Sequence, residues 1–242
     1  MKNIKDVCVL ISARLNSHRI PRKMVAPFAG TTLLDVSLQT LLSSKVIPRE
    51  NMILAVCEDE LASIGEKYGI NIYRRSEESS QSEGKDLTVL YEWHDKLDFK
   101  YVVMINPCLP FMTTETIDGF FTSYLNSEHD GMFGVIDKKN YFWDSSGNLI
   151  TEWYDGLACM NTKFVESTYE AANCLYASKL SLIKEGIWMG KTPYTKNNPV
   201  IFPIPEEQCF DVDYPWQFSA AEALYKNKID SIELKNEKQA SS

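Results

Sequence analysis

The residues with the clearest chemical capacity lie in the stretch ARLNSHRIPRKMVAPF, which begins at Ala13 and follows the apolar run VCVLIS. It carries guanidinium, ammonium, amide and hydroxyl donors on Arg14, Asn16, Ser17, Arg19, Arg22 and Lys23. Guanidinium forks bind two oxygens at once and an ammonium acts as a point charge, so this set suits a polyphosphate. A solvated basic loop is the alternative, but the position directly after an expected strand favours a ligand site. The stretch lacks G-x-x-x-x-G-K and is therefore not a Walker A loop.

A second candidate site is the pair Asp211 and Asp213 in FDVDYP. In an extended segment, side chains two residues apart point the same way, so both carboxylates can face one cation. Such oxygen ligands suit Mg²⁺, which usually keeps several waters and bridges to substrate phosphates. A surface strand with two acids is the commoner explanation for the pair alone, whereas its combination with the basic stretch favours a magnesium site.

A third candidate lies in VVMINPCLPFMTTETI, where Asn106 and Cys108 follow the end of an expected strand. Their polar atoms would lie where an acceptor molecule could sit. The alternative is a connection shaped by prolines, with Thr113 or Thr114 capping the next helix. The residues alone leave both interpretations open.

The elements that must position these residues alternate between apolar β-branched runs and helical patterns. Strands are predicted over Val7–Ile11, Met52–Val56, Ile70–Tyr73 and Tyr101–Ile105, and helices over Thr32–Leu42, Glu58–Tyr68, Leu87–Leu97 and Thr114–Tyr124. This alternation predicts βαβ units and a parallel sheet covered on both faces. Ligands bind beyond the carboxyl ends of strands in such sheets, which is where the basic stretch begins. We therefore predict an α/β fold, three-layered and Rossmann-like.

Residues 141–195 break this alternation and are rich in aromatic side chains. We predict an inserted lobe or dimerisation element there, within a single domain that covers residues 1–242. The stretch FDVDYPWQFSAAEALY then predicts a strand end and a final helix. We assign the aromatic residues to packing or an interface rather than to base stacking, because basic residues are not regularly interleaved among them.

Composition excludes several classes of protein. The net charge of -8 over 242 residues argues against a general nucleic-acid coat. The six cysteines are scattered singly and the three histidines lack ligand spacing, so we expect reduced thiols rather than a disulfide framework or zinc site. The sequence carries no signal-peptide pattern and no apolar run near the roughly 20 residues that span a bilayer. We expect a cytoplasmic protein with neither a membrane nor a nucleic-acid partner.

Taken together, these motifs resemble those of the cytidylyltransferases that activate acidic sugars, the acylneuraminate and keto-deoxy-octulosonate enzymes. The family signature A-R-x-x-S-x-x-x-P-x-K-N is matched at Ala13, Arg14, Ser17, Pro21 and Lys23. The family elements Q-P-T-S-P-L-R, N-G-A-x-Y and D-I-D-T-P-E-D-F resemble NPCLPFM from Asn106, NCLYAS from Asn173 and DVDYPWQF from Asp211. The matches are collinear and span most of the chain.

The resemblance implies a nucleotidyltransferase that uses CTP, binds Mg²⁺ through Asp211 and Asp213, and forms a homodimer through the inserted lobe. Catalytic roles would fall to Arg14, Arg19 and Lys23. The CTP-binding set would be Ala13, Arg14, Asn16, Ser17, Lys23, Arg75, Ser82 and Gly84, with cytosine recognition around the last three. Acceptor binding would involve Asn106, Cys108 and Asn173.

The sequence departs from the family in the second element, where Asn106 and Met112 replace its Gln and Arg. Loss of an arginine removes a natural partner for a carboxylate. We therefore favour a smaller phosphorylated acceptor, L-glutamine phosphate, which would give CDP-L-glutamine for capsule phosphoramidate synthesis. A nine-carbon acidic sugar, giving a CMP-nonulosonic acid, is the alternative. A metal-dependent glycosyltransferase and a non-catalytic nucleotide-binding module are further alternatives.

Overall fold

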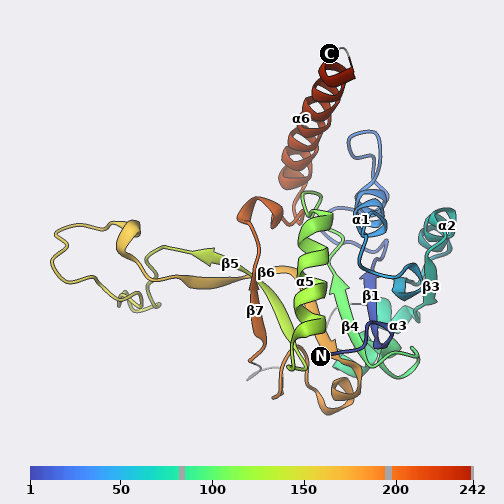
Figure 1. Ribbon diagram of the computed structural model, residues 1–242, viewed down its shortest axis with the longest axis horizontal. Coiled ribbons are helices and arrows are strands. Elements are labelled where there is room, and N and C mark those ends of the chain that lie inside the picture. The colour runs from blue at the N-terminus through green and yellow to red at the C-terminus, as the bar shows by residue number, and fades with distance from the viewer. Residues whose placement is uncertain (82–84, 194–197, 241–242) are drawn as a thin grey trace.

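The computed structural model describes residues 1–81, 85–193 and 198–240, built around a sheet in the order β3-β2-β1-β4-β6-β5-β7 (Figure 1). The predicted strands appear as β1 Val7–Ser12, β2 Met52–Val56, β3 Asn71–Arg74 and β4 Tyr101–Ile105. The sequence analysis missed three further strands, β5 Met132–Lys138, β6 Thr168–Lys179 and β7 Val200–Pro203. Strands β1 to β4 pair in parallel, whereas β6 runs antiparallel to both β4 and β5. The α/β prediction is therefore confirmed, with an antiparallel extension on one side.

The helices are α1 Leu33–Leu42, α2 Asp59–Tyr68, α3 Glu77–Ser80, α4 Leu87–Leu90, α5 Thr114–Asn126 and α6 Pro215–Ala240. Short 3₁₀ turns occur at Ile4–Asp6, Arg49–Asn51, Glu92–Asp95, Thr162–Phe164, Leu180–Glu185 and Glu206–Gln208. Local signals fix several ends. The Thr32 hydroxyl accepts from the backbone N–H of Asp35 at the start of α1, and Gly69 ends α2 in the left-handed conformation. Among the described residues, no helix is long and apolar enough to cross a membrane.

Both faces of the central sheet are buried, as continuous apolar strands predict. Alternate residues of β1 face opposite ways: Val9 and Ile11 pack with α1 and α5, whereas Leu10 packs with Trp93 and the turn at Leu180–Glu185. Because the chain leaves β1 toward β2 on one side and β4 lies on the other, the sheet changes direction between β1 and β4. This switch point is where open α/β sheets bind ligands.

The predicted helix Leu87–Leu97 is wrong in its second half. Helix α4 stops at Leu90, and Tyr91 leaves helical geometry with φ -112° and ψ 44° before the 3₁₀ turn Glu92–Asp95. The Tyr91 ring lies 5.1 Å from Trp93 and 4.5 Å from Trp188, and Trp93 is fully buried. Burying these rings outweighs the modest cost of breaking a short helix.

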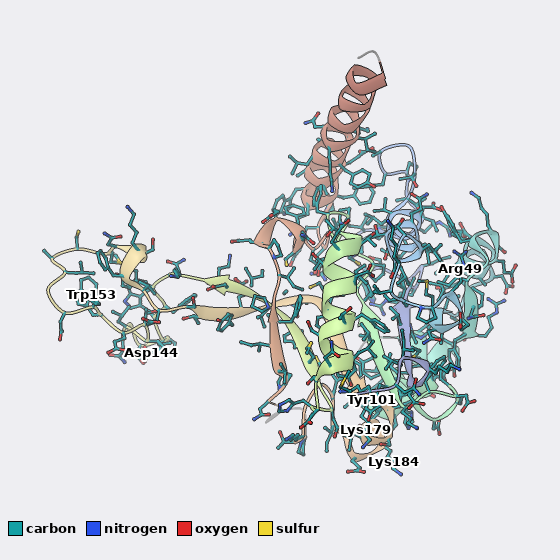
Figure 2. The ribbon with its side chains drawn as sticks, in the orientation of Figure 1. Arg49, Tyr101, Asp144, Trp153, Lys179 and Lys184 are labelled. Atoms are coloured by element: carbon teal, nitrogen blue, oxygen red, sulfur yellow. The ribbon has the colours of Figure 1, made fainter. Side chains whose placement is uncertain are left out.

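The predicted boundaries of the inserted lobe, 141–195, are also wrong, because Thr168–Lys179 is a strand between β4 and β5 in the main sheet. Only residues 139–167 extend away from the sheet, between β5 and β6 (Figure 1). We call this segment the arm. Figure 2 shows Asp144 and Trp153 on the arm, far from Tyr101 and Lys179 in the body.

Helix α6 rises from the body at another point (Figure 1). Its first half is anchored on the loop that follows β1: the ring of Phe28 lies 5.4 Å from those of Phe218 and Tyr225, and Glu222 accepts a hydrogen bond from the Ala29 N–H. The Gln217 side chain accepts from the N–H groups of Asp213 and Tyr214, each at 2.8 Å. The segment before α6 is thereby fixed beside the loop after β1.

Candidate active site

A pocket of about 500 Å³ opens at the carboxyl ends of β1 and β4, at the switch point of the sheet. It brings together eight of the residues predicted from the sequence: Ala13, Arg14, Ser17, Arg19, Lys23, Asn106, Cys108 and Asp213. We call it the phosphate pocket.

Lys23 connects the two halves of the phosphate pocket. Its side chain is largely buried, and its Nζ donates to the Val212 carbonyl at 2.5 Å and lies 3.4 Å from Asp213 Oδ1. The Val212 N–H in turn donates to the Cys108 carbonyl at 3.0 Å. A buried ammonium needs such partners. These contacts place the ammonium between the loop after β1 and the segment before α6.

Asp213 is held by two cations, because Arg19 Nη2 lies 2.9 Å from the same Oδ1 that faces Lys23. The Arg19 guanidinium also lies over the Tyr214 ring, 4.9 Å from its centroid. The predicted strand at these acids is wrong, because residues 211–213 form a loop that leads into α6.

Asp211 is in a different electrostatic position from Asp213. Its Oδ2 accepts from Asn106 Nδ2 at 3.3 Å, and its Oδ1 is buried without a hydrogen-bond partner among the described residues. Burial raises the pKa of this carboxyl, and the nearby Asp213 carboxylate raises it further, whereas Lys23 lowers it. An orphaned carboxylate oxygen next to a second carboxylate is a costly arrangement unless a cation occupies it.

These two carboxylates fit the magnesium implied by the sequence resemblance. The donor set is hard oxygen, and Asp211 offers an oxygen that no described group satisfies. In the described parts of the chain, groups of three or more His, Cys, Asp or Glu side chains do not converge as a metal site. The pair would therefore depend on water and substrate oxygens for its remaining ligands, as magnesium sites commonly do.

Arg75 lies on the opposite side of the β1 end. Its Nη1 donates to Ser12 Oγ at 2.6 Å, and its other nitrogens contact the hydroxyl and carbonyl of Ser79. Arg14 donates to the carbonyl of the next residue, Ser80, at 3.1 Å. Two arginines thus fix the α3 turn against the end of β1.

Not every predicted residue joins this pocket. Asn16 is exposed and outside the lining, and Arg22 pairs with Glu60 of α2 at 2.6 Å. Met112 is buried in the main core, so its side chain does not face a site and the argument from the lost family arginine has no geometric support. Ser82 and Gly84 lie outside the described residues.

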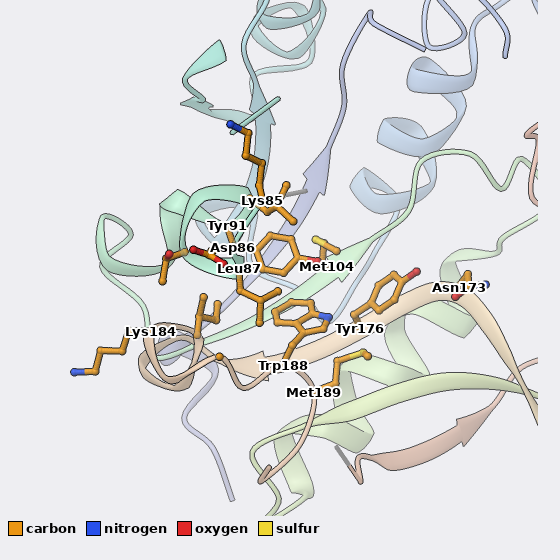
Figure 3. Close-up of a pocket in the computed structure, with 14 residues that line it drawn as sticks. Lys85, Asp86, Leu87, Tyr91, Met104, Asn173, Tyr176, Lys184, Trp188 and Met189 are labelled. Carbon is orange, nitrogen blue, oxygen red and sulfur yellow. The ribbon is translucent and has the colours of Figure 1, made fainter. Parts of the chain in front are cut away.

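A second cavity, of about 750 Å³, has walls of Tyr91, Met104, Tyr176, Trp188 and Met189, with Asn173 at one end (Figure 3). We call it the aromatic cavity. The Trp188 ring lies 4.5 Å from Tyr91 and 6.4 Å from Tyr176. The rim lysines are directed elsewhere: Lys85 pairs with Glu78, and Lys184 points away from the cavity in Figure 3.

The two cavities meet at one hydrogen bond. Asn106 lines the phosphate pocket, Asn173 lines the aromatic cavity, and Asn106 Nδ2 donates to the Asn173 carbonyl at 2.9 Å. A molecule lying in the aromatic cavity can thus extend one end toward the phosphate pocket.

Sequence reasoning missed several residues of these two cavities. Ser12, His18, Met24 and Pro107 also line the phosphate pocket, and Glu58 fixes its loop by accepting from the Leu15 N–H at 2.7 Å. The place of Ser12 at the end of an apolar run was a usable signal. The aromatic walls gave none, because Tyr91 and Trp188 are brought together only by tertiary packing.

Comparison with known proteins identifies the class. The chain belongs to the cytidylyltransferase family, whose model matches residues 8–231. It is 25% identical over 229 residues to N-acylneuraminate cytidylyltransferase A of Danio rerio, covering 90% of this chain and 50% of that protein. It is 19% identical over 238 residues to a pseudaminic acid cytidylyltransferase of Campylobacter jejuni, covering 94% of this chain and 99% of that relative.

The chain therefore spans about half the length of the fish relative and nearly all of the bacterial one. Among solved structures, CMP:2-keto-3-deoxy-manno-octonic acid synthetase complexed with CTP superposes with a TM-score of 0.66. That likeness covers 92% of this chain and 99% of the other at 11% identity, and it establishes the shared fold.

Proposed function

We propose that this chain transfers the CMP group of CTP to an oxygen of a small acidic acceptor and releases pyrophosphate. The observation that carries the proposal is the convergence of Arg19, Lys23 and two carboxylates, Asp211 and Asp213, at the switch point of the sheet. Cations for a triphosphate and hard oxygens for its metal are both needed for nucleotidyl transfer.

In this reaction an acceptor oxygen attacks the α-phosphorus as the bond to the pyrophosphate oxygen breaks. An ionised acid needs little activation, so positioning and charge stabilisation dominate. Arg14, Arg19 and Lys23 would neutralise charge that grows on the departing pyrophosphate. Magnesium bound by Asp211 and Asp213 would supply further positive charge at the phosphate oxygens.

Cytosine recognition is proposed for the other side of the β1 end. Arg75 is held there by Ser12 and Ser79, and Arg14 by Ser80. Burial lowers the pKa of Arg75, but the group stays charged because a free guanidinium titrates above about 12. The α3 turn that the two arginines fix would form one wall of a base site.

The acceptor is proposed to lie in the aromatic cavity with its acid group toward the phosphate pocket. A nine-carbon acidic sugar is one candidate, since the relatives named above are N-acylneuraminate and pseudaminic acid enzymes. L-glutamine phosphate, which would make CDP-L-glutamine, is the second.

We also propose a homodimer formed through the arm. Large apolar side chains are exposed there, among them Trp143, Ile150, Tyr154, Met160 and Phe164, and exposed apolar patches of this kind mark protein interfaces. Sedimentation velocity tests this directly. We expect a dimer for the wild type and a shift toward monomer for Ile150→Asp, with no shift for the control Val46→Asp, which is exposed in the segment after α1, outside the arm.

The proposed activity is tested by pyrophosphate release from CTP with each candidate acceptor. Release with CTP and at least one acceptor, and much less with UTP or ATP, is the expected result. A glycosyltransferase would release a nucleotide instead, and a binding module would retain CTP without turnover with any acceptor. Preference for UTP or ATP would contradict the proposal.

A further inference from the structure

We propose that Asn106 is a positioning residue that fixes the Asp211 carboxylate for metal binding, and that the irregularity of β6 at Asn173 serves to anchor it. This inference rests on the metal site of the proposed function. It removes Asn106 from the acceptor contacts expected from the sequence and gives it a role toward the metal.

The contacts of Asn106 define one orientation of its amide. Nδ2 donates to the Asn173 carbonyl at 2.9 Å and to Asp211 Oδ2 at 3.3 Å, while Oδ1 accepts from the Cys108 N–H at 3.0 Å. Two acceptors face the nitrogen and one donor faces the oxygen, so the reverse orientation would mismatch all three. The amide therefore has no N–H donor left for a substrate.

The anchor of this network is an irregular part of β6. Between the register pairs Phe133–Tyr176 and Val135–Ala171, β6 contains extra residues opposite a single residue, Gly134, of β5. Asn173 lies within them at φ 51°, in the left-handed region that Asn tolerates better than most residues. In this conformation the Asn173 carbonyl points toward the Asn106 side chain rather than toward a neighbouring strand.

Gly134 makes room for this irregularity. A Cβ atom there would lie 2.6 Å from Ile204 Cδ1 and 3.2 Å from Cys174 Sγ, the side chain next to Asn173. The backbone N–H of Asn106 also donates to the Cys174 carbonyl at 2.9 Å, which ties the end of β4 to the same irregular segment. Bulges of this kind often re-aim groups beside active sites.

As a result, the two carboxylate oxygens of Asp211 have different surroundings. Oδ2 is fixed by Asn106, and Oδ1 is buried and unsatisfied among the described residues. The cations Arg19 and Lys23 form their ion pairs with Asp213 instead. In a carboxylate fixed in this way, the oxygen without a hydrogen-bond partner is the one that can serve as a metal ligand.

The test measures Mn²⁺ binding to the full chain with CTP present and acceptor absent, by electron paramagnetic resonance, together with steady-state kinetics. Loss of a group that orients a metal ligand typically weakens metal affinity by about 10- to 100-fold. We expect Asn106→Ala to weaken Mn²⁺ binding by at least about tenfold, with the KM of the acceptor changed by less than about twofold. Asn106→Gln, which keeps an amide, should recover part of the loss, and the exposed Asn126→Ala should match the wild type.

Unchanged Mn²⁺ affinity in a folded Asn106→Ala protein would overturn the inference, as would a raised acceptor KM with unaltered metal affinity. Should Asn106→Ala prove unfolded by circular dichroism, Asn106→Gln decides in its place: its Mn²⁺ affinity should fall below that of the wild type, and an unchanged affinity would overturn the inference. If no acceptor supports turnover, the proposed function fails, yet the Mn²⁺ titration still decides the role of Asn106. Absence of Mn²⁺ binding in the wild type would overturn the inference outright.

Discussion

The phosphate pocket and the aromatic cavity lie next to each other but are built in opposite ways. In the phosphate pocket, charged groups pair across 190 positions of sequence, as Lys23 does with Asp213. The aromatic cavity has rings and two thioethers for walls, and the ammonium groups of its rim lysines point away from it or pair with Glu78. Their shared boundary is the hydrogen bond between Asn106 and the Asn173 carbonyl.

This difference indicates how binding and chemistry are divided. Charges that are already fixed by the fold need no reorganisation when a triphosphate arrives or pyrophosphate leaves. Aromatic walls bind the body of an acceptor through contact area and provide little charge to hold its acid group. The acid group is therefore free to meet the phosphate pocket, where the reaction is proposed to occur.

The largest expected effect comes from removing charge in the phosphate pocket. We expect Lys23→Ala or Asp213→Ala to lower kcat by roughly a hundredfold or more, because the first removes a preorganised cation from the phosphate pocket and the second removes a proposed magnesium ligand. The neighbouring Arg22→Ala, whose guanidinium pairs with Glu60 instead, should remain within about threefold of the wild type. Steady-state kinetics on folded proteins, checked by circular dichroism, make the measurement. Near wild-type kcat in either charge variant would show that the residue has no such role.

A smaller effect, on stability, is expected at the wall of the aromatic cavity. A Cβ at Gly131 would collide with the backbone carbonyl of Met189, so Gly131→Ala should lower the free energy of unfolding by about 1–3 kcal/mol. At Gly119, in α5, the nearest atom to an added Cβ is Phe202 Cζ at 3.6 Å, so Gly119→Ala should stabilise by about 0.5–1 kcal/mol. Urea unfolding gives both values, and equal effects of the two changes would contradict the assigned packing.

A substitution in the aromatic cavity should weaken binding of the acceptor and leave binding of CTP almost unchanged. Tyr176→Ala removes a ring from its wall, and we expect the acceptor KM to rise about tenfold while the KM of CTP changes little. Tyr169, exposed on the same strand and outside the cavity, supplies the control Tyr169→Ala. A rise in the KM of CTP with an unaffected acceptor KM would contradict the assignment of acceptor binding to the aromatic cavity.

The last prediction concerns thiol reactivity in the phosphate pocket and involves no change in activity. Burial raises the pKa of Cys108 to about 11, so its thiolate is scarce at pH 8. Alkylation by iodoacetamide should therefore be at least about tenfold slower than at the exposed Cys159 and should accelerate as the pH rises toward about 11. Peptide mass spectrometry after timed labelling measures both rates. Fast labelling of Cys108 at pH 8 would show a pocket more open or more basic than the structure describes.

The sequence predicted the parts of the fold whose signals are local. Continuous apolar runs identified β1, β2 and β4, helical spacing of apolar residues identified α1, and the glycine at Gly69 gave the end of α2. The helix over Leu87–Leu97 failed because aromatic packing around Tyr91 acts through residues almost a hundred positions away, such as Trp188. Strand β6 was missed because its irregular middle interrupts the alternation that marks a strand.

The residues of the candidate site also fall into those that local sequence signals predict and those that only tertiary packing reveals. The donors between Ala13 and Lys23, together with Asp213, could be chosen from residue type and position after a strand, and the structure brings most of them into one pocket. The role of Met112 could not be judged, because sequence does not say that its side chain faces the core. Nor could the aromatic cavity be anticipated, since its walls come from four separate segments of the chain.

The most direct test of the account follows the α-phosphorus of CTP. With CTP radioactively labelled at that phosphorus, we expect label in the acceptor product, one pyrophosphate released per product formed, and loss of both in Lys23→Ala. Label that stays in CDP or CMP while the acceptor is unlabelled would contradict the proposed chemistry of the phosphate pocket.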